Sequence, residues 1–203
     1  MNYYIGDLHF GHQNIIKFDK RPYELVEDMD DDLIYQWNKV INKDDDVYIL
    51  GDMSWHGPTE TENILKQLKG NKHLVIGNHD HIWLSDATKA YFETIEHIIK
   101  INDHIDSDTY KVIMTHYPVP LITGHRKSKT FLLYAHVHNS EEWELAELMY
   151  DLAAAKAGSK ADHFNVGCMM PYVDYTPRTL KEIVLRGRRF REDKKMKYCR
   201  VAK

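Results

Sequence analysis

The chain has little of several features that define common protein classes. Its two cysteines, Cys168 and Cys199, form no pairing motif, so we expect a reducing compartment rather than a disulfide framework. No apolar run approaches the length of a membrane span, and the N-terminus lacks the charged and apolar regions of a signal peptide. Repeats and low-complexity linkers are missing, and the net charge of -4 indicates no particular partner. The expectation is a single cytoplasmic domain over residues 1–203, with no membrane contact.

Five short apolar runs predict buried β-strands. They are rich in β-branched and aromatic residues and nearly continuous in apolarity, which is typical of strands covered on both faces. The runs are residues 2–6, 47–51, 73–77, 111–115 and 131–135. The first three end in glycine, which lets the chain turn sharply at that point.

Helical patterns alternate with these strands. Apolar side chains recur at spacings of three and four, or the segment is rich in Ala, Leu and Glu. Helices are predicted at residues 24–42, 59–69, 141–156 and 178–185, with a hairpin over 96–101 and 109–115 and a last strand over 163–166. The alternation of strand and helix predicts an α/β domain.

Side chains of the metal-ligand type follow most of the predicted strands. They fall in the motifs GDLHFGH, GDMSW, GNHD, MTHYP and AHVH, in that order along the chain. Loops at strand ends are where α/β folds gather their functional groups, so we expect these side chains to converge. The seven candidate ligands are Asp7, His9, Asp52, Asn78, His116, His136 and His138.

The composition of this set favours a transition metal over calcium. Imidazole nitrogens mixed with carboxylate oxygens suit Mn, Fe, Zn or Ni. In Asp7-x-His9 and in His136-x-His138, the two side chains point to the same side of an extended chain. Asp52 has two carboxylate oxygens and can bridge two ions. Two divalent ions against two carboxylates leave a net positive site, which suits an anionic substrate.

The ordered motifs D-x-H, G-D, G-N-H-D, a lone histidine and H-x-H resemble those of the calcineurin-like metallophosphoesterase superfamily. The resemblance runs over residues 1 to about 168 and implies a four-layer α/β/β/α sandwich, with the site at the carboxyl edges of the strands. It implies that one divalent ion is held by Asp7, His9, Asp52 and His138, and a second by Asp52, Asn78, His116 and His136. It also implies that His79 is the acid or the transition-state stabiliser. Ala135 stands where the family usually has glycine, so we expect a slight local shift without loss of metal.

The activity implied by this resemblance is hydrolysis of a nucleotide-like phosphodiester or phosphomonoester. A metal-bridging hydroxide attacks phosphorus directly, His79 protonates the leaving oxygen, and Asp80 supports His79. The alternative is a non-catalytic module of the same fold that binds a protein partner. Such modules tend to lose the histidine at position 79 or some ligands, and all are present here. The segment 139–162 is a candidate specificity element or oligomer contact, and the sequence predicts no oligomeric state.

Four further features have two interpretations each. His12 lies at the expected mouth of the site, where it contacts a phosphate or belongs to the surface. Arg21 binds a phosphate through its guanidinium or lies in a solvated loop. Trp55 lines the pocket or packs against the core. The basic segment 186–203 touches nucleic acid or is a solvated helix end, and the acidic charge of the whole chain favours the second.

Overall fold

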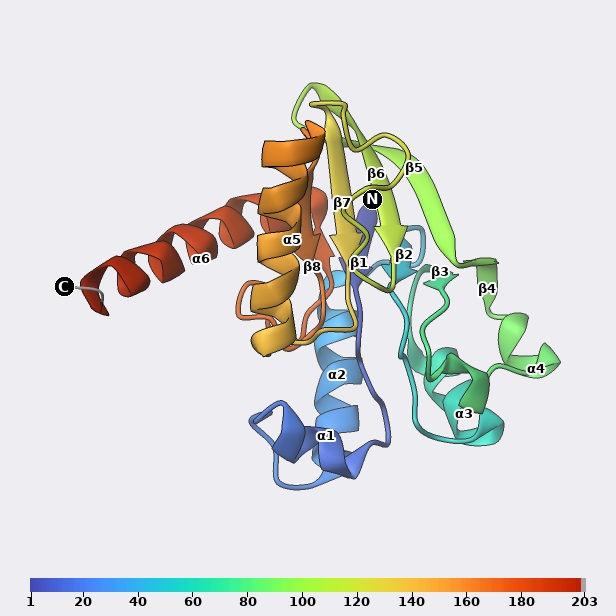
Figure 1. Ribbon diagram of the computed structural model, residues 1–203. Helices are drawn as coiled ribbons and strands as arrows, with labels where there is room; N and C mark the ends of the chain where they lie inside the picture. The colour runs from blue at the N-terminus through green and yellow to red at the C-terminus, as the bar shows by residue number, and fades with distance from the viewer. Residues whose placement is uncertain (202–203) are drawn as a thin grey trace.

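Two β-sheets, both mainly parallel, form the framework of the molecule (Figure 1). The computed structural model describes residues 1–201, with side chains to residue 194. The first sheet contains β1 (Asn2–Ile5), β2 (Asp46–Ile49), β3 (Asn71–Val75), β4 (Phe92–Glu96) and β9 (Arg178–Thr179). The second contains β5 (Ile98–Ile105), β6 (Asp108–Thr115), β7 (Thr130–Tyr134) and β8 (Asp162–Asn165). The predicted α/β class is confirmed.

The order of the strands brings five loops to the same region. In the first sheet the order is β4-β3-β2-β1-β9, with β1 to β4 parallel and β9 antiparallel to β1. In the second sheet the order is β5-β6-β7-β8, with β6 to β8 parallel. An antiparallel hairpin joins β5 to β6 through the two-residue turn at 106–107. The loops that follow β1, β2, β3, β6 and β7 therefore leave the carboxyl ends of parallel strands, where α/β folds place their sites.

Helices connect the strands (Figure 1). They are α1 (Gln13–Phe18), α2 (Val26–Val40), α3 (Pro58–Gln67), the 3-10 helix η1 (Asp80–Ile82), α4 (Asp86–Lys89), α5 (Glu141–Ala157) and α6 (Leu180–Val201). Met29, Leu33 and Trp37 form the buried face of α2, as their spacing predicts. Among residues 1–201, no helix combines the length and the apolarity that crossing a membrane requires.

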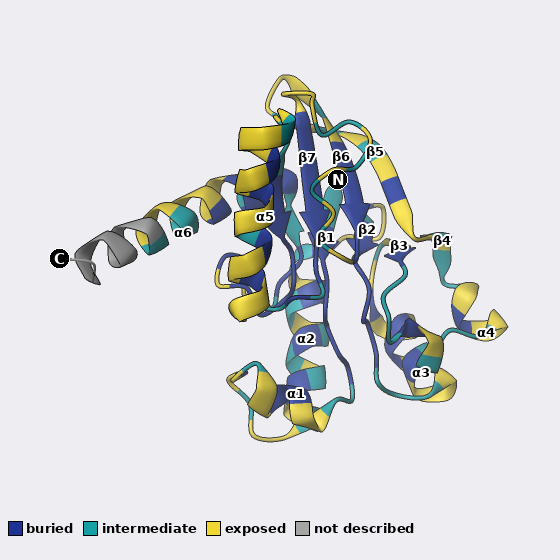
Figure 2. Ribbon diagram, viewed as in Figure 1, coloured by how far each residue is buried: buried dark blue, intermediate teal, exposed yellow. Residues whose placement is uncertain are grey.

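The central strands are buried while the outer side of α5 is exposed (Figure 2). All five residues of β7 are buried, as the continuous apolar run at this position predicts. The strands predicted from the sequence are all present, with ends that shift by up to a few residues. The sequence does not predict β4, β9, α1 or α4, because these elements are short or only weakly apolar.

The last helix differs from its prediction at both ends. Arg178 and Thr179 pair with β1 as the short strand β9, so the helix begins at Leu180. Thr179 and Glu182 form a capping box: the N–H of Thr179 donates to Glu182 Oε2 (3.0 Å), and the N–H of Glu182 donates to Thr179 Oγ1 (3.4 Å). The helix continues to Val201 rather than ending near residue 185, because the Arg, Lys and Glu residues that follow are strong helix formers.

The basic segment at residues 186–203 is partly paired within the molecule. Arg188 donates to Asp162 Oδ2 (3.0 Å), and Arg191 forms an ion pair with Glu147 (2.9 Å). Charges held in this way are less available to nucleic acid phosphates. The basic residues from position 195 onward lie outside the described side chains.

The two sheets are joined at Gly6, directly after β1. Its N–H donates to the carbonyl oxygen of Val166 (2.8 Å), and its own carbonyl oxygen accepts from the N–H of Cys168 (2.8 Å). A Cβ at this position would lie 2.8 Å from the Cβ of Ala135 and 3.3 Å from the Cβ of Leu50. Glycine at position 6 therefore provides the space for the methyl group of Ala135.

We expect Gly6→Ala to destabilise the protein through this contact. Overpacking of a tight core typically costs about 1–3 kcal/mol, and urea unfolding should show a loss of this size. Adding Ala135→Gly removes the facing methyl group, so the double variant should recover part of the loss. If the two substitutions simply add, the contact between positions 6 and 135 is not the cause.

Candidate metal centre

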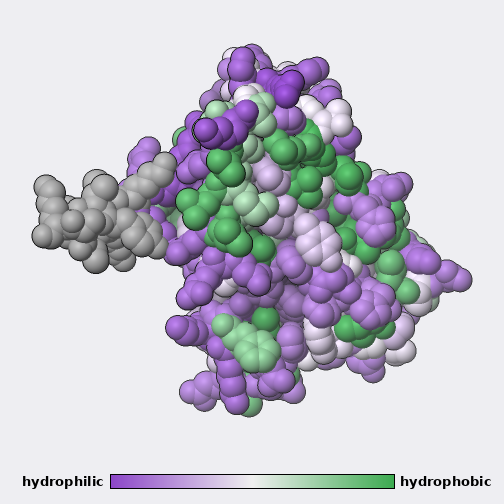
Figure 3. Space-filling view, in the orientation of Figure 1, coloured by the Kyte–Doolittle hydropathy of each residue, from purple (hydrophilic) through white to green (hydrophobic). Residues whose placement is uncertain are grey.

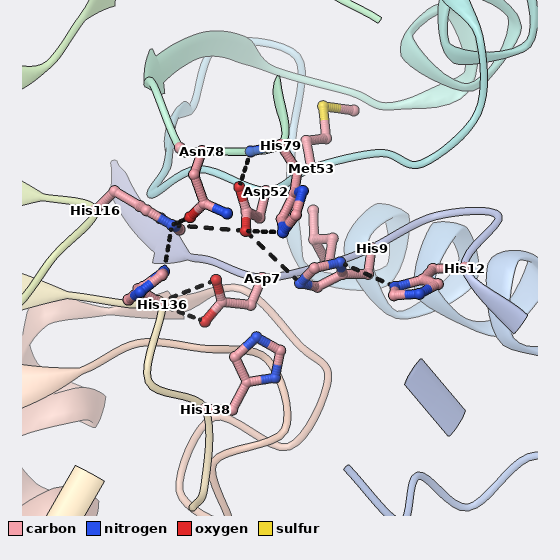
Figure 4. Close-up of polar contacts among 12 residues, drawn as sticks. Asp7, His9, His12, Asp52, Met53, Asn78, His79, His116, His136 and His138 are labelled. Atoms are coloured by element: carbon pink, nitrogen blue, oxygen red, sulfur yellow. Dashed lines mark hydrogen bonds and ion pairs between the residues drawn. The ribbon is translucent and has the colours of Figure 1, made fainter. Parts of the chain in front are cut away.

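The seven predicted ligands converge on the loops that follow β1, β2, β3, β6 and β7 (Figure 4). Their side chains form two groups, in each of which the ligand atoms lie within 4.8 Å of one another. The first group is Asp7, His9 and His138, and the second is Asp52, His116 and His136. Asn78 lies beside the second group, since its Oδ1 is 3.0 Å from His116 Nε2.

Asp52 belongs to the second group, and its carboxylate also faces the first. Its Oδ2 lies 4.0 Å from His9 Nε2 in the first group and 3.6 Å from His116 Nε2 in the second. A carboxylate in this place can give an oxygen to each of two ions. The other carboxylate, Asp7, accepts a hydrogen bond from the backbone N–H of His136 (3.0 Å). This bond connects the loop after β1 to the loop after β7, which carries one histidine of each group.

The site contains a buried nitrogen that no described residue satisfies. His9 Nε2 is buried and has no hydrogen-bond partner among the described residues. Burial, together with the nearby charges of His138 and Arg21, lowers the pKa of His9 well below its ordinary value, so the ring is neutral. A neutral imidazole is the form that binds a metal ion, and an unsatisfied buried nitrogen calls for a partner. The donor set therefore fits a transition metal.

Neighbouring acceptors determine which nitrogen of two histidines faces the site. His116 Nδ1 donates to the carbonyl oxygen of Leu50 (2.8 Å), which leaves Nε2 with the lone pair. His138 Nδ1 donates to Asp19 Oδ1 (2.7 Å). Burial lowers the pKa of His138, but the carboxylates of Asp7 and Asp19 outweigh it and raise the pKa above its ordinary value. Acceptors of this kind orient metal-binding histidines and increase their basicity.

Arg21 lies behind the first ligand loop, which differs from the predicted phosphate contact. Its buried guanidinium donates to the carbonyl oxygens of Asp7 (2.8 Å) and Leu8 (2.7 Å) and to the carboxylate of Asp19 (3.0 Å). These partners hold the loop from inside the protein. Both interpretations of Arg21 from the sequence, a substrate-binding residue and a solvated loop residue, are wrong because the side chain is fully buried and already paired.

The backbone is strained at the candidate ligands. Nine residues other than glycine have a positive φ in the described chain. Five of the nine are candidate ligands, with φ between 48° and 71°: Asp7, His9, Asp52, His136 and His138. Strain of this kind costs on the order of 1–3 kcal/mol per residue and is concentrated at functional sites. This feature points to the same side chains as the sequence motifs but is independent of them.

Asp80 organises two of the ligand loops. Its buried carboxylate accepts hydrogen bonds from the backbone N–H groups of Asp52 (3.1 Å), Met53 (2.9 Å) and Gly77 (2.7 Å), and from one indole N–H (3.0 Å). The predicted support of the His79 ring by Asp80 is wrong, because these four donors occupy both carboxylate oxygens. Asp80 instead fixes the backbone of the two neighbouring loops that follow β2 and β3.

A pocket of about 340 Å³ lies over the two groups, with His12 and His79 on its walls. The ring of Trp55 stacks on His12, with 4.1 Å between the ring centroids, and lies 4.3 Å from the ring of His79. His79 Nε2 is 4.0 Å from Asp52 Oδ2. His12 and Trp55 therefore both line the pocket, and Trp55 also packs against His12 and His79.

Comparison with known sequences gives partial matches. No family model matches the chain. The chain is 42% identical over 80 residues to the uncharacterized protein MJ1445 of Methanocaldococcus jannaschii, which is 38% of this chain and 46% of that protein. It is 32% identical over 130 residues to the Gene 66 protein of Mycobacterium phage L5, which is 57% of this chain and 62% of that protein. The matches thus span less than two thirds of the length of these two relatives.

Among solved structures, this chain resembles AQ665 from Aquifex aeolicus, a protein of unknown function. The two align over 90% of this chain and 97% of AQ665, with 25% identity and a TM-score of 0.63, so they share their overall fold. The nuclease MPE of Pseudomonas putida and the phosphoesterase Yfce of E. coli align at TM-scores of 0.40 and 0.32, each with 16% identity. They cover 68% and 67% of this chain, and TM-scores in this range do not establish a common fold.

Asp19→Asn should weaken metal binding through His138. The amide nitrogen can donate to Nδ1, which stabilises the tautomer with its proton on Nε2, the nitrogen needed as the ligand. We expect the affinity for Mn²⁺ to fall by about 10- to 100-fold in isothermal titration calorimetry. Asp28→Asn, on the exposed side of α2, is the matched control. Equal affinities for the wild type and both variants would show that Asp19 does not orient His138.

Proposed function

We propose that this chain is a metal-dependent phosphoesterase of the calcineurin-like metallophosphoesterase superfamily. The observation that supports this most directly is the position of Asp52, which belongs to the second group of Asp and His side chains and also faces the unsatisfied nitrogen of His9 in the first. The order of the motifs along the chain supports the same conclusion. On this proposal, the two sheets and their helices form the single-domain, four-layer α/β/β/α sandwich of that superfamily.

The proposed cofactor is a pair of divalent ions of the Mn, Fe, Zn or Ni type. One would be held by Asp7, His9, Asp52 and His138, and the other by Asp52, Asn78, His116 and His136. When bound, such ions lower the pKa of a water molecule and neutralise negative charge on a phosphoryl group. The ligand set contributes two carboxylates, so the loaded site keeps a net positive charge and attracts an anionic ester.

His79 is the proposed acid. Its ring lies on the pocket wall, and its side chain is 36% exposed, so it can reach both substrate and solvent. In this position it can donate a proton to the leaving oxygen of the ester. His12, on the adjacent wall, can donate a hydrogen bond to a phosphate oxygen. The described residues that line the pocket include no serine or cysteine, so water is the proposed nucleophile.

An exposed aromatic side chain at the rim supports a nucleotide-like substrate. Phe18, at the end of α1, lines the pocket and is 73% exposed. Its ring lies 6.3 Å from the ring of His12, in an edge-to-face arrangement. A phenyl ring left in water beside a phosphate site offers a surface on which a nucleobase can stack.

The proposal is tested by hydrolysis of bis-p-nitrophenyl phosphate with Mn²⁺. We expect metal-dependent turnover by the wild type. Asp52→Asn should lose at least about 100-fold in rate, because the bridging charge is removed. His79→Ala should lose about 10²- to 10⁴-fold on an ester with a poor leaving group, and less on p-nitrophenyl esters, which need little protonation.

Two controls accompany this assay. Asp44→Asn and His104→Ala make the same chemical changes at exposed positions and should retain full activity. A fully active Asp52→Asn enzyme would contradict the proposed metal site. A protein that binds two ions but hydrolyses no ester would favour the alternative of a non-catalytic binding module.

Phe18→Ala should reduce activity selectively on substrates that carry a base. The test compares thymidine 5′-p-nitrophenyl phosphate with methyl p-nitrophenyl phosphate. The two esters share a leaving group, and the second carries a methyl group in place of the nucleoside. Loss of base stacking should lower kcat/KM for the thymidine ester by about 5- to 100-fold and leave the methyl ester unchanged. Phe18→Tyr keeps the ring and should restore the preference. Equal losses on both esters would show that Phe18 does not recognise the base.

A further inference from the structure

The outer face of α5 carries an exposed apolar stripe. Four side chains form it, and Figure 3 shows apolar surface in the region where Figure 1 places α5. The stripe consists of Leu145 (58% exposed), Leu148 (65%), Met149 (38%) and Leu152 (59%). These positions follow the spacing i, i+3, i+4, i+7, so they lie along one side of the helix.

A neighbouring face of α5 already packs on the protein. Trp143, Ala146, Tyr150 and Ala153 are buried there. The stripe is therefore a second apolar face, which the core of the same chain does not require. A helix with apolar residues on two sides is typical of one that is covered on both, and contiguous exposed apolar surface marks an interaction site.

We propose that this stripe is the contact between two copies of the chain, packed α5 against α5 in antiparallel orientation about a two-fold axis. Such an axis makes the same patch face itself, so the patch must be self-complementary. With the axis between Leu148 and Met149, Leu148 lies opposite Met149 of the second copy, and Leu145 lies opposite Leu152 of the second copy. Apolar residues then meet apolar residues along the whole stripe.

The charges at the two ends of the stripe fit the same register. Glu141 and Lys156 are exposed on α5, four residues beyond Leu145 and Leu152 respectively, so each continues the stripe by one turn. The axis that pairs Leu148 with Met149 also sets Glu141 opposite Lys156 of the second copy, and Lys156 opposite its Glu141. A parallel pair would instead place like charges together. The apolar and charged positions thus select one arrangement.

The small area of the stripe limits the expected affinity of the dimer. One helix face buries less than the ~800 Å² per partner of a standard interface. We therefore expect a dimer with a dissociation constant in the range of about 1–100 μM. The four apolar side chains of the stripe include no candidate ligand, so the proposal does not rest on the proposed function. Glu141, at the end of the stripe, does line a pocket with His136 and His138.

Sedimentation velocity of the full chain, over about 1–500 μM, tests the proposal. The mass should rise from 24.0 kDa to about twice that value with concentration. Leu148→Gln should raise the dissociation constant by at least about 10-fold. Leu25→Gln, at a residue that is 56% exposed and precedes α2 rather than lying on α5, is the matched control and should leave the dissociation constant unchanged.

A charge exchange tests the register. Glu141→Lys alone and Lys156→Glu alone each create two like-charge pairs, so each homodimer should weaken by at least about 3-fold. An equimolar mixture of the two variants restores both ion pairs and should form a heterodimer about as tight as the wild-type dimer. Glu27→Lys, on α2, is the control for a change of net charge.

Three results would overturn the proposal. A wild type that remains at 24.0 kDa over the whole concentration range would show that the stripe does not bind a second copy of the chain, and a different protein would then be its partner. A dimer that Leu148→Gln does not weaken would use another surface. Single charge variants that weaken the dimer, with no recovery in the mixture, would exclude the antiparallel register.

Discussion

One buried carboxylate, that of Asp80, holds together the region that carries the candidate ligands. It accepts the backbone N–H groups of Asp52 and Met53 after β2, and of Gly77 after β3. Each of these donors would cost about 1–3 kcal/mol if buried without an acceptor, so the two loops are stable only where all of them meet the same carboxylate. In that conformation the side chain of Asp52 points to the other loops, and its Oδ1 accepts from the N–H of His79 (2.9 Å).

The strain at the ligands is maintained by hydrogen bonds between the first two loops. The N–H of Asp7 donates to the carbonyl oxygen of Gly51 (3.1 Å), and the N–H of His9 donates to that of Asp52 (3.0 Å). In the loop after β7, the N–H of Val137 donates to the carbonyl oxygen of Ala135 (2.8 Å). This bond closes a tight turn at His136. The positive φ values are therefore determined by several contacts at once, which is how a site can keep its geometry before any ligand arrives.

The sequence predicted the strands and the set of polar side chains at their ends, because both depend on local patterns. It did not predict the supports of that set. Asp19 and His138 are 119 residues apart, and no local pattern links them. Arg21 stands in a polar segment typical of a surface loop, and its burial depends on two carbonyl oxygens that only the fold brings near it. The start of the last helix also differs from its prediction, because β9 pairs with β1, a strand far away in the sequence.

The hairpin of β5 and β6 turns at residues 106–107, at the end of β6 opposite to the one that leads into His116. The turn is two residues long and exposed, and Asp106 has a positive φ of 54° there. Tight, exposed turns far from a site are where chains best tolerate being cut, lengthened or fused. The molecule therefore has a natural position for new termini or an inserted label, which leaves the five loops around the candidate metal centre uninterrupted.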